Sequence, residues 1–347
     1  MEQNKNKSRK KIFFWIISII ILLAITSTVF TYRMVFKPIG LPETEYLYID
    51  NNSNYDDVID QIKEKIELPN EKIFNLLSER MNYQNMVKTG RYAIEDGITM
   101  PDLIRKLRSG SQTPIKLTFN NIRTIESLAG RLSSQLMVDS ISILEVLRDT
   151  TLAAKYGFNE QTFGTMFIPN TYEVYWDTNV ENLIDRMKRE YDSFWNEERR
   201  AKAEKINLTP IEVATLASIV EEEATYAEEY PIVAGLYINR LNRGMRLEAD
   251  PTVKFAVGDA TLRRILFKHL EVESPYNTYK IDGLPPGPIR IPSTASINAT
   301  LSPAQHNYIF MCAKDDLSGR HNFAVTHAEH ARNARAYQKA LNERGIY

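Results

Sequence analysis

The chain has 347 residues, 43% of them hydrophobic and 25% charged, which is typical of globular protein and sufficient for two or three domains. Residues 1–11 carry five basic side chains and one acidic one, so the remainder holds 38 basic and 43 acidic residues. A mildly acidic body argues against nucleic acid as a partner. The single cysteine, Cys312, excludes an intrachain disulfide and a Cys-based zinc cluster, and we interpret it as a buried strand thiol.

The N-terminal region predicts a membrane anchor. Residues 12–30 are uncharged, and such a stretch is long enough to cross a bilayer as one helix, so residues 12–32 are the predicted single-pass span. The basic tail before it, residues 1–11, favours a cytoplasmic N-terminus, with the rest of the chain outside the plasma membrane. The alternative is a cleaved signal peptide. We favour an uncleaved anchor, because residues 26–32 lack a small-x-small cleavage site.

A short linker with two prolines and a glycine, residues 37–42, precedes a predicted small domain at residues 40–116. Its pattern alternates strand, turn and helix, first at residues 46–66 and again at 90–110. The pattern resembles a LysM-like α/β module, a fold that recognises amino-sugar polymers. The alternative is a plain α+β packing domain without a ligand.

Residues 117–347 form the predicted larger domain, and they are mainly helical at the start. A single charged helix is expected at residues 182–205, with Met187, Tyr191 and Trp195 facing inward. Residues 163–176, FGTMFIPNTYEVYW, are dense in aromatic side chains and interleaved hydroxyls, a composition that suits sugar rings. The alternative for this segment is a loop that belongs to the core.

The C-terminal part begins with a rigid turn at residues 283–288, GLPPGP, which can be neither helix nor central strand. A strand is expected at residues 304–313. Thr326 is the predicted N-cap of a final helix to Arg344, with Glu329 completing a capping box. His327 and His330 lie three residues apart on that helix, but no third ligand accompanies them, so we predict no metal and no other cofactor.

Three consecutive glutamates end an apolar helix in the segment 216–250. At 3.6 residues per turn, Glu223 shares a face with Val220, Ile219 and Leu216. Desolvation on an apolar wall disfavours a charged carboxylate and raises its pKa, which is what a general acid near neutral pH needs. Glu223 is therefore the candidate catalytic acid. The alternative is that the run is a solvated helix face.

Several motifs together resemble the YceG-like (MltG) endolytic murein transglycosylases. They are LASIVEEE at 216–223, YINR at 237–240, GMRLEADPTV at 244–253, SPYNTY at 274–279 and GLPPGPI at 283–289, and the loop FIPNTY at 167–172 and the tail HNFAVTHAEH at 321–330 fit the same family. The likeness covers essentially the whole chain, so it implies an α+β architecture with an anchor, a LysM-like module and a catalytic domain.

The resemblance implies a lyase that cuts the MurNAc–GlcNAc bond of nascent peptidoglycan and leaves 1,6-anhydro-MurNAc ends. The family motif places the catalytic glutamate at Glu223, the residue that the helical spacing also favours. Peptidoglycan glycan strands are the implied partner, and peptidoglycan synthases are possible further ones. The residues expected to bind the glycan are Tyr172, Glu221, Asn239, Asp250, Thr252, Asn277 and Tyr279.

Some positions differ from the family pattern. The family usually has Gln where this chain has Glu248 and Thr where it has Ala249, and its Asn-Pro-Gly is replaced at residues 290–293. Two other hypotheses stay open. One is an inverting muramidase in which Asp250 or Glu248 activates water opposite Glu223. The other is a glycan-binding scaffold without catalysis. Asp250 has its own structural alternative, capping the turn before Pro251.

Overall fold

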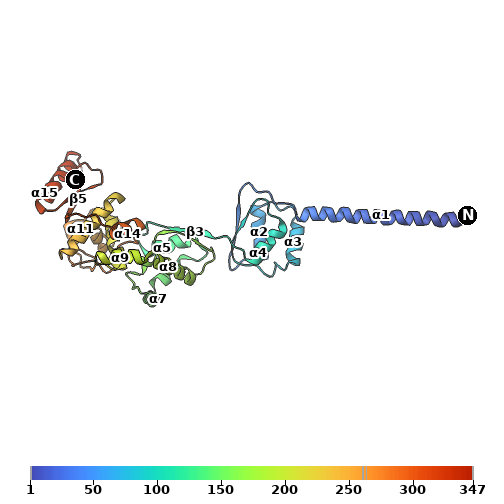
Figure 1. Cartoon of the computed structure of the whole chain (residues 1–347), viewed down its shortest axis with the longest axis horizontal. Coiled ribbons are helices and arrows are strands. Elements are labelled where there is room, and N and C mark those ends of the chain that lie inside the picture. The colour runs from blue at the N-terminus through green and yellow to red at the C-terminus, as the bar shows by residue number, and fades with distance from the viewer. Residues whose placement is uncertain (1, 260–261, 263, 346–347) are drawn as a thin grey trace. The chain divides into compact units, whose positions relative to one another are not determined.

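The computed structural model describes residues 2–259, 262 and 264–345 (Figure 1). The chain divides into two compact units, Met1–Ile115 with Glu173–Asp177, and Lys116–Tyr172 with Thr178–Tyr347. Each unit combines helices with two-stranded sheets, so the predicted mixed helix-and-strand class is confirmed. The limits predicted for the small and large domains, 40–116 and 117–347, stay a prediction.

The first unit opens with the long helix α1 (Glu2–Val35). Within its segment Lys11–Val35, the most apolar stretch of 18 residues has a mean hydropathy of 2.6, and none of that stretch is buried inside the protein. At 1.5 Å per residue this segment is about 37 Å long, against a bilayer core of about 30 Å. The helix is therefore long and apolar enough to cross a membrane, as the sequence predicts.

The rest of the first unit is a small α/β core. Strand β1 (Glu45–Ile49) pairs antiparallel with β2 (Gly90–Ile94). Helices α2 (Tyr55–Lys65), α3 (Glu71–Arg80) and α4 (Met100–Ser109) complete it. Thr99 caps α4 through its hydroxyl and Pro101 stands in the first turn. The predictions did not include α3, which Asn70 caps. The centre of the core is fully buried, at Leu47, Ile62, Phe74, Tyr92 and Leu103.

The second unit contains residues 116–119 of β3 (Ile115–Phe119) and residues 170–172 of β4 (Asn170–Val174), and the two strands pair in a two-stranded sheet. Between these strands lie α5 (Ile125–Ser133), α6 (Ser140–Arg148), α7 (Thr150–Lys155) and the 3-10 turn η1 (Phe163–Met166). The aromatic segment at 163–176 thus includes η1 and β4, and its residues Phe163, Phe167 and Tyr172 are buried. The packing agrees with the core alternative for this segment.

The single helix predicted at 182–205 is wrong in its length. The structure has α8 (Val180–Phe194) followed by a separate helix α9 (Glu197–Lys205). The break occurs because Trp195 leaves helical geometry and the Asn196 side chain accepts a hydrogen bond from the Arg199 N–H, starting a new helix. The predicted inward side chains of α8 are buried.

Helix α10 (Pro210–Glu223) is the centre of the second unit. Thr209 and Glu212 form a capping box at its start. Every residue from 213 to 220 is buried, as expected for a helix surrounded by protein on all sides. Helices α11 (Tyr230–Asn242), α12 (Asp250–Val257) and α14 (Thr294–Leu301) pack against it. The short elements η2 (Ala227–Glu229) and α13 (Phe267–Leu270) lie in the connections.

The chain ends in a hairpin and a helix. Strands β5 (Phe310–Ala313) and β6 (His321–Ala324) pair antiparallel, and α15 (His327–Glu343) packs on both. Thr326 caps α15, as predicted, but the capping box is wrong, because the Glu329 carboxylate accepts from the Val325 N–H instead of the Thr326 N–H. Cys312 lies in β5 but is only half-buried, since one side of this strand faces a cavity.

Candidate active site

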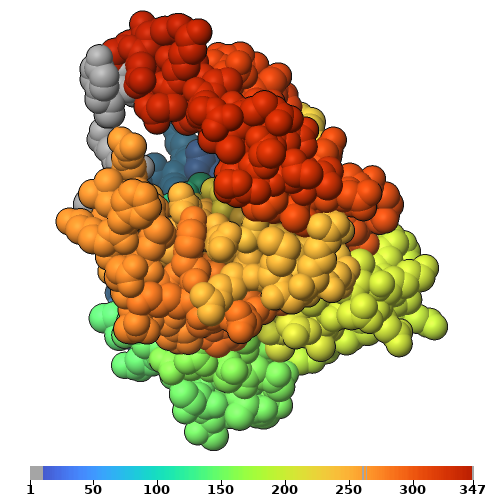
Figure 2. Space-filling model, turned by 90° about the vertical axis from the view of Figure 1, so that its left-hand side faces the viewer, coloured from blue at the N-terminus to red at the C-terminus, as the bar shows by residue number. Residues whose placement is uncertain are grey.

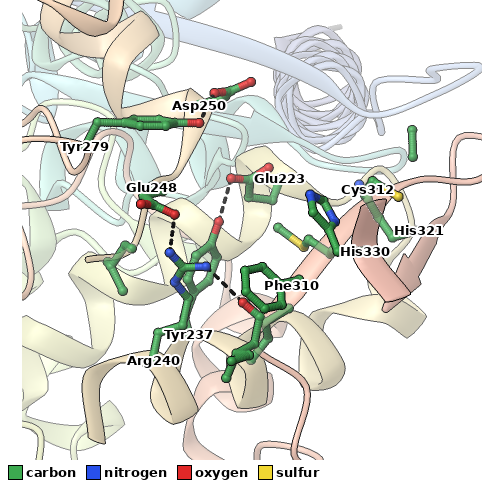
Figure 3. A pocket seen from close by; sticks show the side chains of 15 residues that line it. Glu223, Tyr237, Arg240, Glu248, Asp250, Tyr279, Phe310, Cys312, His321 and His330 are labelled. Carbon is green, nitrogen blue, oxygen red and sulfur yellow. Dashed lines mark hydrogen bonds and ion pairs between the residues drawn. The ribbon is translucent and has the colours of Figure 1, made fainter. Parts of the chain in front are cut away.

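A cavity of about 370 Å³ lies within the second unit. One wall is the carboxyl end of α10 together with α11 and residues 247–250, and the other is β5 with two histidines of the C-terminal segment. Figure 2 shows the surface hollowed between the C-terminal segment in red and the orange region around residues 265–285. The side chains that line the cavity include two further carboxylates beside Glu223 (Figure 3).

Glu223 enters this cavity from the last turn of α10. Its neighbours on the same helix face, Leu216, Ile219 and Val220, are fully buried, as the helical spacing predicts. Tyr237 of α11 donates its hydroxyl to Glu223 Oε1 at 2.6 Å. The pKa of Glu223 is raised to about 7. Desolvation by burial raises it most, the Tyr237 hydrogen bond lowers it, and the negative charges of Asp250 and Glu222 add to the rise.

The other two glutamates of the run are directed away from the cavity, toward a buried cation. Glu221 Oε1 lies 3.1 Å from Arg290 Nη2, and Glu222 Oε1 lies 2.7 Å from Arg290 Nη1. Glu221 Oε2 also accepts hydrogen bonds from the Ser293 N–H and the Ser296 hydroxyl. These carboxylates therefore hold the segment after the rigid turn against α10.

Asp250 and Tyr279 line the cavity together with Glu223. The Tyr279 hydroxyl donates to Asp250 Oδ1 at 2.7 Å. Asp250 is the first residue of α12, whose N-cap, Ala249, makes no side-chain cap. The Asp250 carboxylate is thus turned toward Tyr279 and the cavity rather than capping the helix (Figure 3).

The remaining predicted binding residues make hydrogen bonds inside the protein. The Asn239 amide donates to the carbonyls of His306 and Tyr308, and the Tyr172 hydroxyl donates to the Ile168 carbonyl. Thr252 is fully buried beside Thr278, with 2.7 Å between their hydroxyl oxygens. The structure does not bring these three residues to the lining of the cavity.

Asn277 is also fully buried. Its amide donates to the carbonyls of Leu270 and Val272, while its side-chain oxygen accepts from the Tyr279 N–H. Asn277 therefore fixes the backbone at Tyr279 through this hydrogen bond. Tyr279 in turn lines the cavity and donates its hydroxyl to Asp250. Of the eight predicted site residues, Glu223, Asp250 and Tyr279 are those that line the cavity.

Sequence reasoning missed an ion pair in the wall. The Arg240 side chain is only 6% exposed, and its guanidinium contacts the Glu248 carboxylate and donates to the carbonyls of Arg246 and Ile309. Glu248 has φ +51°, a conformation that costs energy for a residue with a side chain. Only the fold brings residues 240, 248 and 309 together, so no sequence signal could have identified this contact.

Two histidines complete the opposite wall. His321 Nδ1 lies 3.0 Å from Glu229 Oε2, and the His321 N–H also donates to Glu229 Oε1. His330 stacks on Phe310, and its buried Nδ1 has no hydrogen-bond partner among the described residues. Burial first, then the charges of His327 and Arg240, lower the pKa of His330, so its ring is neutral near pH 7.

The described residues include no group of three His, Cys, Asp or Glu side chains arranged to hold a metal ion. A carboxyl with a pKa near 7 is partly protonated at neutral pH and can give up and take back a proton within one cycle. Hydroxyls and a second carboxylate beside it suit a ligand rich in hydroxyl groups.

Comparisons with known proteins found similar chains. A crystal structure of a YceG-like protein from Listeria monocytogenes superposes with a TM-score of 0.55 at 27% identity, covering 84% of this chain and 99% of that one. An endolytic murein transglycosylase of Bacillus subtilis is 29% identical over 273 residues, which is 74% of this chain and 75% of the relative.

An endolytic murein transglycosylase of Streptococcus pneumoniae R6 is 27% identical over 362 residues, covering 92% of this chain. The match spans 64% of the pneumococcal protein. The model of the YceG-like family matches residues 47–336, which takes in the small α/β core, the whole of α10 and every residue that lines the cavity. With this match extending over most of its length, the chain belongs to the YceG-like family.

Proposed function

We propose that this protein is an endolytic lytic transglycosylase that cuts the MurNAc–GlcNAc β-1,4 bond of nascent peptidoglycan and leaves 1,6-anhydro-MurNAc ends. The observation that carries the proposal is Glu223, whose carboxyl lies in a cavity with a pKa of about 7. The relatives from Bacillus subtilis and Streptococcus pneumoniae carry the name of this activity, which supports the same reaction here.

The proposed mechanism needs one acid that works twice. Protonated Glu223 gives its proton to the glycosidic oxygen as the bond to C1 of MurNAc breaks. The resulting carboxylate then takes the proton of the C6 hydroxyl of the same sugar as this oxygen attacks C1. No water is consumed, and the N-acetyl group supports the cationic intermediate. The Tyr237 hydroxyl at 2.6 Å stabilises Glu223 while it is ionised between the two steps.

Asp250 and Tyr279 are the residues proposed to hold the sugar beside Glu223, because both line the same cavity. The Asp250 charge also helps to keep the proton on Glu223. Glu221, Asn239, Thr252, Asn277 and Tyr172 were predicted to bind the glycan, and that prediction stays open. Their internal hydrogen bonds support a role in shaping the walls.

The wider setting of the reaction is also a proposal. Helix α1 anchors the chain in the plasma membrane with its N-terminus in the cytoplasm, and the catalytic unit works outside the cytoplasm on newly made strands, terminating them during cell-wall synthesis. The small α/β core of the first unit acts as a LysM-like module that binds glycan. Peptidoglycan synthases are the proposed protein partners.

The test is the mass of the products formed by the full chain in detergent on uncrosslinked peptidoglycan strands. A transglycosylase gives anhydro ends, whereas a hydrolase gives ends heavier by one water per cut. Glu223→Gln is expected to lower the rate at least about 1,000-fold without changing the fold, because the proton donor is lost. Full activity of this variant would refute the role of Glu223.

A second function is supported by Asp250, since it puts another carboxylate in the cavity with Glu223. In an inverting muramidase, Asp250 would activate a water on the far side of the sugar. The same mass measurement separates the two functions. A hydrolase of this kind would yield no anhydro ends and would lose its activity in Asp250→Asn.

A further inference from the structure

A second pocket of about 230 Å³ lies in the same unit. Neighbouring residues in the chain line the two pockets. Glu223 and Asp250 line the cavity described above, and Glu222 and Pro251 line the second pocket. The end of α10 and the start of α12 therefore form a wall between them. An endolytic enzyme must bind sugar units on both sides of the bond that it cuts, so a neighbouring pocket has a natural place in the path of a long strand.

The second pocket combines an apolar surface with cations. Pro251, Lys254, Phe255 and Gly258 follow helical spacing and form one face of α12 toward it. Phe255 is 40% exposed, and its ring centroid lies 4.7 Å from that of Tyr276. This contact holds the Phe255 ring in place. Ile289, which is 6% exposed, adds a further apolar side chain to the lining.

The charges of this pocket are not all used within the protein. Arg123 Nη2 lies 3.1 Å from Glu222 Oε1, but the Arg123 side chain is 59% exposed and keeps donors free for a ligand. Lys254 forms no ion pair with any residue that the structure describes. Glu222 and Asp259 also line the pocket, so it suits a ligand with mixed charge and apolar groups better than a bare anion.

We propose that this pocket binds the peptide substituent of the muramyl sugar next to the cut, with Lys254 and Arg123 meeting its carboxylates and Phe255 covering its apolar atoms. Each peptide stem of peptidoglycan carries several carboxylates, whereas a glycan stripped of its peptides keeps only the single lactyl carboxylate of each MurNAc. The inference rests on the proposed function for the substrate class, and it adds that Lys254 distinguishes peptide-bearing strands from denuded ones.

The experiment measures binding apart from cleavage. The full chain in detergent, carrying Glu223→Gln, is titrated calorimetrically with a peptide-bearing glycan fragment and with the same fragment after its peptides have been removed by an amidase. Lys254→Glu is expected to weaken binding of the peptide-bearing fragment roughly tenfold, the equivalent of one charge-assisted contact, and to leave the denuded fragment unchanged. Lys254→Arg should keep the affinity.

Lys268→Glu is the matched control, since it makes the same charge reversal on an exposed residue that does not line the pocket. Equal losses for both fragments, or no loss for either, would overturn the proposal. Cleavage products of the otherwise unmodified chain report separately on the proposed function. Absence of anhydro ends with discrimination by Lys254 intact would reject the lyase activity and keep the peptide site.

Discussion

The carboxyl end of α10 has two regions that differ in their surroundings although they carry the same side chain. On one side, Glu221 and Glu222 both pair with Arg290, and Glu221 accepts further hydrogen bonds from Ser293 and Ser296. On the other, Glu223 lies against apolar residues and a tyrosine hydroxyl, and burial raises its pKa to about 7. Three consecutive glutamates thus take different roles. Arg290 makes Glu221 and Glu222 structural carboxylates, whereas the apolar helix face beside Glu223 makes it a proton donor.

The largest effect is expected from removing the cation on the structural side. Arg290→Met leaves the Glu221 and Glu222 carboxylates without their common partner, in a site where the Arg290 side chain is 6% exposed. Breaking a buried ion pair on one side costs about 3–5 kcal/mol of stability, and thermal melting of the full chain would measure it. Arg123→Met is the control, because its side chain is 59% exposed and should cost about 1 kcal/mol or less.

A comparable melting temperature for these two variants would mean that Arg290 does not organise the structural side.

The next effect is expected on the catalytic side, where replacing Glu223 by glutamine should stabilise the protein relative to the wild type at high pH. The pKa of Glu223 is about 7 in the folded protein against 4.5 for the free group. Below the lower value Glu223 is protonated in both states. As the pH rises toward 7, only the unfolded state loses this proton, so the wild-type protein loses stability. Glu223→Gln cannot ionise and does not lose stability in this way. Its free energy of unfolding relative to that of the wild type should therefore rise by up to about 3 kcal/mol between pH 4 and pH 8.

Melting curves of both proteins across this pH range provide the measurement. Glu198→Gln, at an exposed position on α9, is the control and should show no gain at high pH. A stability difference between Glu223→Gln and wild type that does not change with pH would contradict a desolvated Glu223.

A smaller effect is expected from the hydroxyl that contacts the acid. Tyr237→Phe removes a hydrogen bond that lowers the pKa of Glu223. Activity needs the protonated acid and should fall as the pH rises through its pKa, so the alkaline limb of the pH–rate profile should move upward by about 0.5–1 unit. Tyr226→Phe is the matched control, because its hydroxyl bonds to the Ser318 carbonyl. A shift toward lower pH would be the opposite of this expectation.

The smallest effect is expected at Glu248, because its side chain is 47% exposed. Glu248→Gln keeps an oxygen for Arg240, which also donates to two backbone carbonyls. Stability should fall by no more than about 1 kcal/mol, with activity within about threefold of wild type. Rates on peptidoglycan strands and melting curves test this. A severe loss in Glu248→Gln would show that the charge itself is needed in the cavity wall.

The helical spacing of α10 was enough to separate Glu223 from its two neighbours, because an apolar face can be counted along one helix. Asp250 and Tyr279 followed from family motifs and do line the cavity. The break between α8 and α9 was missed, because a cap at Asn196 competes with a continuous helical pattern. Helix α3 was missed within the small core.

The apolar N-terminal helix, the acid that faces apolar side chains and the membership of the YceG-like family were all predictable from the amino-acid sequence. These depend on local composition and on spacing within single segments. Three features emerge only in the folded protein: Arg290 pairs with Glu221 and Glu222, Arg240 contacts Glu248, and β5 and His330 form the opposite wall. Such contacts join residues far apart in the chain, and their energies depend on burial and distance, which no local pattern encodes.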